Sequence, residues 1–133
     1  RASLAAKLLF LDDGVAALIR RLAPDRLAVE DVFHAVNARS ALVLGHVRGV
    51  VLLAGAQAGL DVTAFPPAKV KVQVVGYGRA EKAQVALMVS RMLALERDQP
   101  PGDAADALAV ALCGAHEPFA PVALARAAPG RVS

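Results

Sequence analysis

Residues 102–109 read GDAADALA and begin the last strongly apolar segment of a chain of 133 residues. The segment continues to about His116 with the pattern of a helix, so Asp103 and Asp106 fall near the helix start. Side chains three residues apart lie on the same face of a helix. An acidic residue in the first turn also suits the macrodipole and can cap the helix. One interpretation is therefore a capped helix with a solvated acid.

A third carboxylate makes a metal site the alternative interpretation. Residues 26–30, RLAVE, are typical of a short buried strand that ends on Glu30. A strand and a helix can bring Glu30, Asp103 and Asp106 to one place, and hard divalent cations prefer carboxylate oxygens. Like charges gathered without a cation raise one another's pKa, which makes such a cluster poor structural material. The three acids therefore predict a metal site.

Composition describes one domain with an aliphatic core. Hydrophobic residues make up 56% of the chain and charged residues 20%, which argues against disorder. The net charge of +3 permits a polyanionic partner without demanding one. Cys113 is the single cysteine, so no disulfide forms within the chain, and a buried thiol in a reducing cytosol is expected. The three histidines show no zinc-ligand spacing.

Hydrophobic periodicity predicts the other elements. Residues 3–22 carry an apolar stripe at helical spacing, and residues 61–65 predict a second strand that ends at two prolines. Residues 80–96 predict an amphipathic helix. Residues 69–75 alternate with period two, as in a strand, yet Pro67 is also suited to start a short helix there, and both interpretations stay open. The inward side chains of the amphipathic helix are expected to be Val85, Met88, Val89, Met92 and Leu93.

Residues 38–58 predict a long helix that is apolar on nearly every side. Its length also suits a membrane span. His46 and Arg48 near its middle, and the lack of an aromatic belt, argue against a membrane-embedded subunit. In a domain of this size, one side of such a helix has to face another subunit, and Gly45 and Gly49 would allow close approach. We therefore expect a two-fold homodimer through this helix and no membrane.

Four segments, taken together, resemble a known family. They are AVEDVF at 28–33, NARSAL at 37–42, VVGYGRAEK at 74–82 and DAADALA at 103–109. Their order and spacing, over about residues 1–116, are similar to those of RuvC, the bacterial Holliday-junction resolvases. An acidic pair alone is a weak signal, whereas four linked motifs are specific.

The resemblance implies an α/β chain with an RNase H-like fold, a mixed sheet flanked by helices, over residues 1–116. An irregular tail is expected at 117–133. It implies a cytoplasmic, metal-dependent, structure-selective endonuclease of DNA recombination and repair, which nicks two opposed strands of a four-way junction. By resemblance, Glu30, Asp103 and Asp106 match three of the four catalytic and metal-binding carboxylates, with two Mg²⁺ ions, or Mn²⁺, per site. A homodimer and the RuvA–RuvB branch-migration complex are the implied protein partners.

Further residues are candidates for DNA binding. By resemblance, Phe33 matches an aromatic residue that stacks on a base at the junction, and Asn37 falls in the segment that contacts DNA near the cut. Lys71 and Lys82 match basic positions that contact the DNA backbone. Lys69 and Arg79 would also meet phosphates. For each basic residue, a solvated face is the plain alternative.

The family's first carboxylate, which lies on an opening strand in an Asp-x-Gly turn, has no counterpart here. Asp12-Asp13-Gly14 lies inside the first predicted helix and does not replace it. We expect the sequence to be a fragment that lacks the opening strands of the sheet. The alternative function is a catalytically incomplete, dimeric module that binds branched DNA.

Overall fold

Two parallel strands form the centre of the fold in the computed structural model, which describes residues 1–32, 36–95 and 100–118. Strand β1 (Arg26–Glu30) pairs with strand β2 (Asp61–Phe65), with Leu27 opposite Val62 and Glu30 opposite Phe65. Both strands lie where the sequence predicted them. The backbone N–H of Asp31 donates to the carbonyl of Phe65 at 2.8 Å, so the pairing extends one residue beyond β1.

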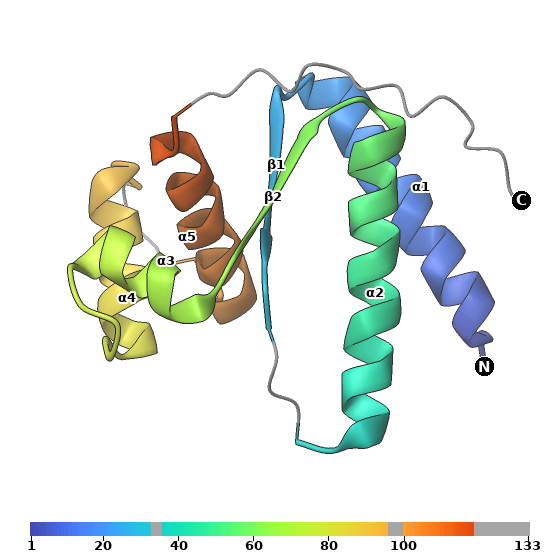
Figure 1. Cartoon of the computed structure of the whole chain (residues 1–133), viewed down its shortest axis with the longest axis horizontal. Helices are drawn as coiled ribbons and strands as arrows, with labels where there is room; N and C mark the ends of the chain where they lie inside the picture. The colour runs from blue at the N-terminus through green and yellow to red at the C-terminus, as the bar shows by residue number, and fades with distance from the viewer. Residues whose placement is uncertain (33–35, 96–99, 119–133) are drawn as a thin grey trace, which may run out of the picture.

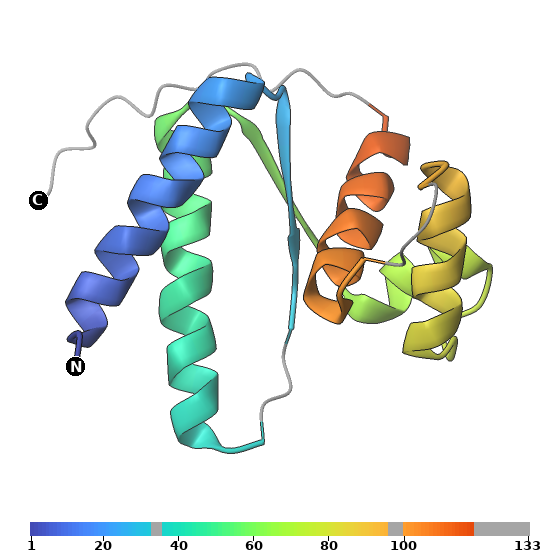
Figure 2. The same cartoon turned by 180° about the vertical axis from the view of Figure 1, so that it is seen from behind.

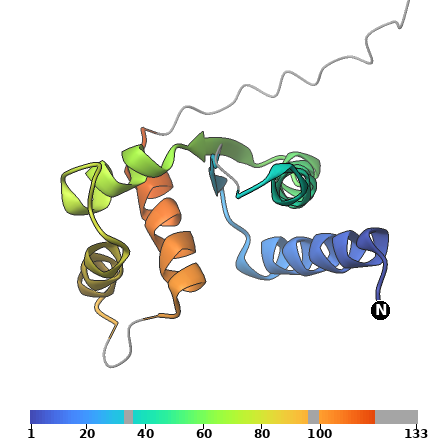
Figure 3. The ribbon, with the colours of Figure 1, turned by 90° about the horizontal axis from the view of Figure 1, so that it is seen from below.

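Helices cover both faces of the strand pair (Figures 1 and 2). On one side, α2 contacts the strands and α1 packs against α2, whereas on the other side α5 contacts the strands and is itself covered by α3 and α4. The view from below shows the same layers edge-on (Figure 3). The helices are α1 (Leu4–Leu22), α2 (Ala38–Gln57), α3 (Pro67–Val75), α4 (Lys82–Met92) and α5 (Gly102–His116).

Residues 69–75, for which the sequence allowed either a strand or a helix, form part of helix α3. Pro67 occupies the first turn, where its missing N–H costs nothing, and Gly76 ends the helix with φ of +102°. Val70 and Val74 are buried, four residues apart, while Val72 between them is 51% exposed. The buried residues are four apart, as on one face of a helix, and not two apart, as on one face of a strand.

The buried core lies on the α5 side of the strands. Its members come from β2, α3, α4, α5 and the turn between α3 and α4. Strand β1 contributes only half-buried residues, so the expectation of a buried strand at 26–30 was wrong within this chain. Met92 and Leu93, expected to point inward, are 42% and 37% exposed because α4 ends at Met92. The core residues are Phe65, Val70, Val74, Ala80, Val85, Val89, Ala109, Val110 and Cys113.

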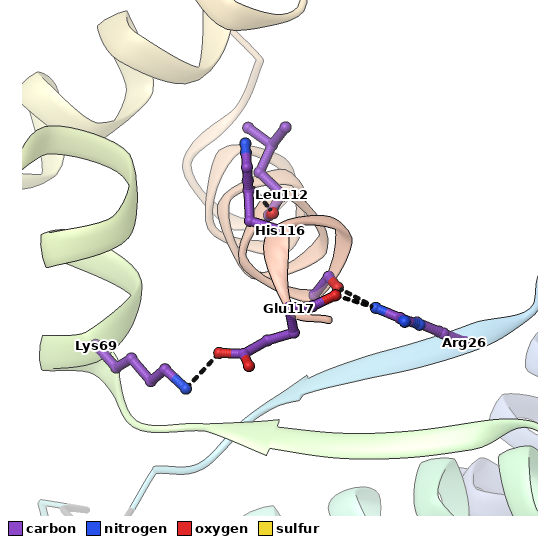
Figure 4. A network of polar contacts seen from close by, with 6 residues as sticks. Arg26, Lys69, Leu112, His116 and Glu117 are labelled. Carbon is purple, nitrogen blue, oxygen red and sulfur yellow. Dashed lines mark hydrogen bonds and ion pairs between the residues drawn. The ribbon is translucent and has the colours of Figure 1, made fainter. Parts of the chain in front are cut away.

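Helix α5 is fastened to the rest of the fold at its C-terminal end (Figure 4). The guanidinium of Arg26 donates to the carbonyls of Gly114 and Glu117, at 2.9 and 2.7 Å, and so satisfies carbonyls that a helix end leaves free. Glu117 also forms an ion pair with Lys69 of α3. Gly114 lies so close to β1 that an added Cβ would be 2.8 Å from the Cβ of Ala28. These contacts set the position of α5 against β1.

Helix α2 is largely uncovered within one chain. Of its residues only Ala54 and Gly55 are fully buried, and Leu42 is 65% exposed. Among the described helices, α2 has the length and hydropathy to cross a membrane, which is weak support for a span because the criterion uses length and composition only. The helix needs a cover that the described residues do not provide.

Candidate active site

The three acids predicted from the sequence border one cavity. Glu30 is the last residue of β1, while Asp103 and Asp106 lie in the first two turns of α5. All three line a cavity of about 340 Å³, together with Val51 of α2 and Val110 of α5. The fold thus brings a strand end and a helix start together, as the sequence predicted. Asp103 lies in the first turn of α5, but no side-chain hydrogen bond caps that helix, so the capping role was wrong.

Glu30 and Asp106 are close enough to influence each other. Partial burial raises the pKa of Glu30 above its ordinary value of 4.5, and the negative charge of Asp106 raises it further. The positive charges of Lys82 and Lys71 act in the opposite direction and lower that pKa. Lys82 also forms an ion pair with Asp106, with 3.5 Å between Nζ and Oδ2. The two acids and two lysines therefore form one electrostatic unit.

A second cavity, of about 280 Å³, is shared by the same four charged residues. Its lining also includes the apolar residues Val70, Val85 and Val110. Lys71 comes from α3, Lys82 from the start of α4, Glu30 from β1 and Asp106 from α5. Four elements thus meet around one hollow, whose lining carries two acidic and two basic side chains.

The other predicted DNA-binding residues lie elsewhere. Arg79 is exposed in the turn between α3 and α4, and the side chain of Asn37 caps α2 by accepting from the backbone N–H of Ser40 at 2.9 Å. Phe33 lies outside the described residues.

Lys69 is separated from the acids by most of the length of α5. Its ammonium lies 5.2 Å from the centre of the Phe65 ring. It also pairs with Glu117 (Figure 4). The hydrogen bond to Glu117 raises the pKa of Lys69. Glu117 follows the C-terminal end of α5, roughly 16 Å along the helix axis from Asp106 at 1.5 Å per residue. The sequence analysis proposed the same role, phosphate binding, for Lys69 and Lys71. In helix α3, residues two apart point in different directions, so only Lys71 borders the cavity of the acids.

The carboxylates fit a hard divalent cation by their chemistry and form a partial ligand set. Within residues 1–32, 36–95 and 100–118, no three His, Cys, Asp or Glu side chains are close enough together to hold a metal ion. Mg²⁺ is commonly held by only one or two carboxylates and keeps several of its waters. The Glu30 and Asp106 pair satisfies that requirement, and the exposed Asp103 lines the same cavity.

Sequence reasoning missed two polar links, one beside the acids and one at the far end of α5. One joins Arg48 of α2 to Asp31, the residue after Glu30, at 3.1 Å. The other is the Arg26 contact to the end of α5. The signal that could have predicted the Arg48 link was the position of this charged residue in the middle of an apolar helix, where it needs a partner.

Comparison with known proteins identifies relatives over nearly the whole described chain. The family model for crossover junction endodeoxyribonuclease RuvC matches residues 1–114. The RuvC of Koribacter versatilis is 56% identical over 100 residues, which cover 75% of this chain and 60% of that protein. The RuvC of Halorhodospira halophila is 49% identical over 125 residues, covering 94% and 74%. The chain spans 60–64% of the length of several of these curated relatives.

Solved structures agree with the sequence relatives. A structure of Thermus thermophilus RuvC matches with a TM-score of 0.78 at 35% identity, and covers 86% of this chain and 69% of that one. The same protein in complex with a Holliday junction substrate matches with a TM-score of 0.81. These likenesses confirm the expected RNase H-like fold, of which the described residues contain the parallel pair β1–β2 and five helices. On the family model, the relatives and the fold together, this chain belongs to the RuvC family.

Proposed function

We propose that the protein is a metal-dependent, structure-selective endonuclease that resolves four-way DNA junctions by paired nicking of two opposed strands. The observation that carries the proposal is the meeting of Glu30 of β1 and Asp106 of α5 in one cavity, which Asp103 also lines. Membership of the RuvC family supports this assignment, because the relatives are crossover junction endodeoxyribonucleases by name.

We assign Glu30, Asp103 and Asp106 as catalytic carboxylates that hold divalent ions, Mg²⁺ or Mn²⁺, two per site. When bound, such ions stabilise charge on the scissile phosphate and activate the attacking water. The chain's own contribution is to hold hard oxygen donors at the end of β1 and the start of α5. Lys82 serves as the counter-charge of Asp106 in the metal-free protein, since its ammonium lies 3.5 Å from that carboxylate.

Lys71 and Lys82 are the basic residues best placed to contact the DNA backbone beside the acids. Both border the cavity that also contains Glu30 and Asp106, so a phosphate at the acids would lie within reach of both ammonium groups. Arg79, Asn37 and Phe33 are further proposed contacts, the last as a stacking residue. Contacts to phosphates make affinity dependent on salt and carry little sequence information.

A homodimer through α2 completes the proposal. Two copies of an acid site suit two opposed cuts, and two-fold symmetry is the usual arrangement of a dimer. The exposed apolar residues of α2 supply a surface for a second copy, since Leu42 is 65% and Leu53 is 55% exposed in one chain and the two lie on the same side of the helix. The Thermus relative was solved with a Holliday junction substrate, which supports the same class of DNA for this protein. The RuvA–RuvB complex is the proposed motor partner.

The test separates binding from cutting. With the full-length gene product, Mg²⁺ and a synthetic four-way junction, wild type should nick two opposed strands. Asp106→Asn should reduce nicking by at least about a thousandfold, as expected when a carboxylate ligand is lost from a metal-assisted site. Junction binding should survive, because the substitution removes a negative charge near the phosphates. Asp13→Asn, on the exposed part of α1, is the control that makes the same chemical change away from the acids.

The outcomes discriminate between functions. If wild type binds the junction and does not nick it, the dimeric branched-DNA-binding module replaces the nuclease. If Asp106→Asn loses binding together with nicking, the catalytic role given to this residue is wrong.

A further inference from the structure

An ion pair outside the acid group joins α2 to the end of β1. A terminal nitrogen of the Arg48 guanidinium, Nη2, lies 3.1 Å from Oδ1 of Asp31, and the two side chains are 36% and 23% exposed. The Nε atom of Arg48 is buried and has no hydrogen-bond partner among the described residues. A partly buried charge of this kind stays in place only when it is paired. The ion pair therefore fixes both side chains: Asp31 compensates the charge of Arg48, and Arg48 ties Asp31 to α2.

Asp31 immediately follows the proposed catalytic Glu30. Its backbone N–H donates to Phe65 at the end of β2. Beyond Phe65 the chain continues into Pro66 and Pro67, which have no N–H to donate, so the ladder cannot extend further. The hydrogen bond of Asp31 is thus the last one between the two strands, and Glu30 lies at the end of the paired segment.

Two features leave this strand end in need of another anchor. First, Glu30 and Asp106 carry like charges in a partly buried place, which favours their separation. Second, a cavity of about 380 Å³ lies between the strand end and α2, lined by Glu30, Asp31, Leu44, Gly45 and Arg48 among others. A Cβ added at Gly45 would meet no atom within 4 Å. Apolar packing against α2 is therefore incomplete here, and the ion pair spans the gap.

We propose that Arg48 is a positioning residue, which clamps Asp31 and thereby keeps Glu30 within reach of Asp106. This inference rests on the proposed nuclease function. Successive side chains of a strand point to opposite faces, so Asp31 can be tied to α2 while Glu30 is directed toward α5. Arg48 touches neither substrate nor metal in this role, and it acts on the rate of cutting through the placement of Glu30.

The experiment measures the single-turnover nicking rate and the junction dissociation constant separately, with the full-length gene product. Arg48→Gln should lower the nicking rate at least tenfold and leave the dissociation constant within twofold of wild type. Asp31→Asn should have the same effect. The double variant should be no slower than either single variant, because both remove one shared interaction. Arg48→Lys keeps the charge and should recover part of the rate.

The control is Arg20→Gln on an exposed position of α1, which lowers the net charge equally and should nick at the wild-type rate. An unchanged nicking rate in Arg48→Gln overturns the clamp. The clamp is also overturned if the loss of nicking rate in the double variant equals the product of the losses in the two single variants. A loss of affinity with an unchanged rate would make Arg48 a phosphate contact instead. If Arg48→Gln fails to fold, Arg48→Lys and Asp31→Asn decide the question. A wild-type protein that does not nick would refute the proposed function itself.

Discussion

Replacing Gly114 by alanine should weaken the joint between α5 and β1. The new Cβ would lie 2.8 Å from the Cβ of Ala28, whereas ordinary contacts begin near 3.4 Å. Ala28 sits on a paired strand and has no flexible side chain to turn away, so helix and strand must separate by at least the shortfall of about 0.6 Å between those distances. Overpacking of this kind costs about 1–3 kcal/mol. Alanine gains about 1 kcal/mol over glycine inside a helix, so the net loss should be at most about 2 kcal/mol.

The loss is measured by urea unfolding at one protein concentration, because a dimer's stability depends on concentration. Gly14→Ala on α1 is the matched control, since an added Cβ there meets nothing within 4 Å. That variant should be more stable than wild type by about 0.5–1 kcal/mol. If Gly114→Ala is stabilised as much as Gly14→Ala, the added Cβ meets no resistance and α5 does not approach β1 as closely as described.

Three further predictions concern charge. Because the pKa of Glu30 is raised in the folded protein, ionising it opposes folding, so stability should fall as pH rises from 4.5 through the raised value. Glu30→Gln should thus be more stable than wild type at pH 7 by a few tenths of a kcal/mol and equal at pH 4, and urea unfolding at both pH values checks this. Burial raises the pKa of the Cys113 thiol, so a thiol reagent should label it about a hundredfold faster in urea than in the native state, and equal rates would contradict the burial. Lys82→Gln should lower the salt dependence of metal-free junction binding by about one unit of slope. Lys69→Gln should leave the slope unchanged, because the ammonium of Lys69 pairs with Glu117 at the end of α5 far from the acids, and equal effects would refute the distinction.

Local patterns were enough to locate most elements. The apolar stripe of residues 3–22, the proline stop after 61–65 and the acidic start of the last helix all depend on neighbours in sequence. Their helices and strands therefore lie close to the predicted bounds. The pattern failed at residues 69–75, where alternation suggested a strand as readily as a helix. Burial of Val70 and Val74 against distant elements decided that segment.

The sequence by itself determined the types of residue available for the chemistry: carboxylates at the end of one strand and the start of one helix, with lysines between them. Only the tertiary structure decided which of them meet. It placed Lys71 and Lys82 beside Glu30, and it paired Lys69 with Glu117 at the far end of α5. It also tied Asp31 to Arg48. The physical reason is that charge acts through space over a few ångströms, and the path of the chain between distant elements sets those distances.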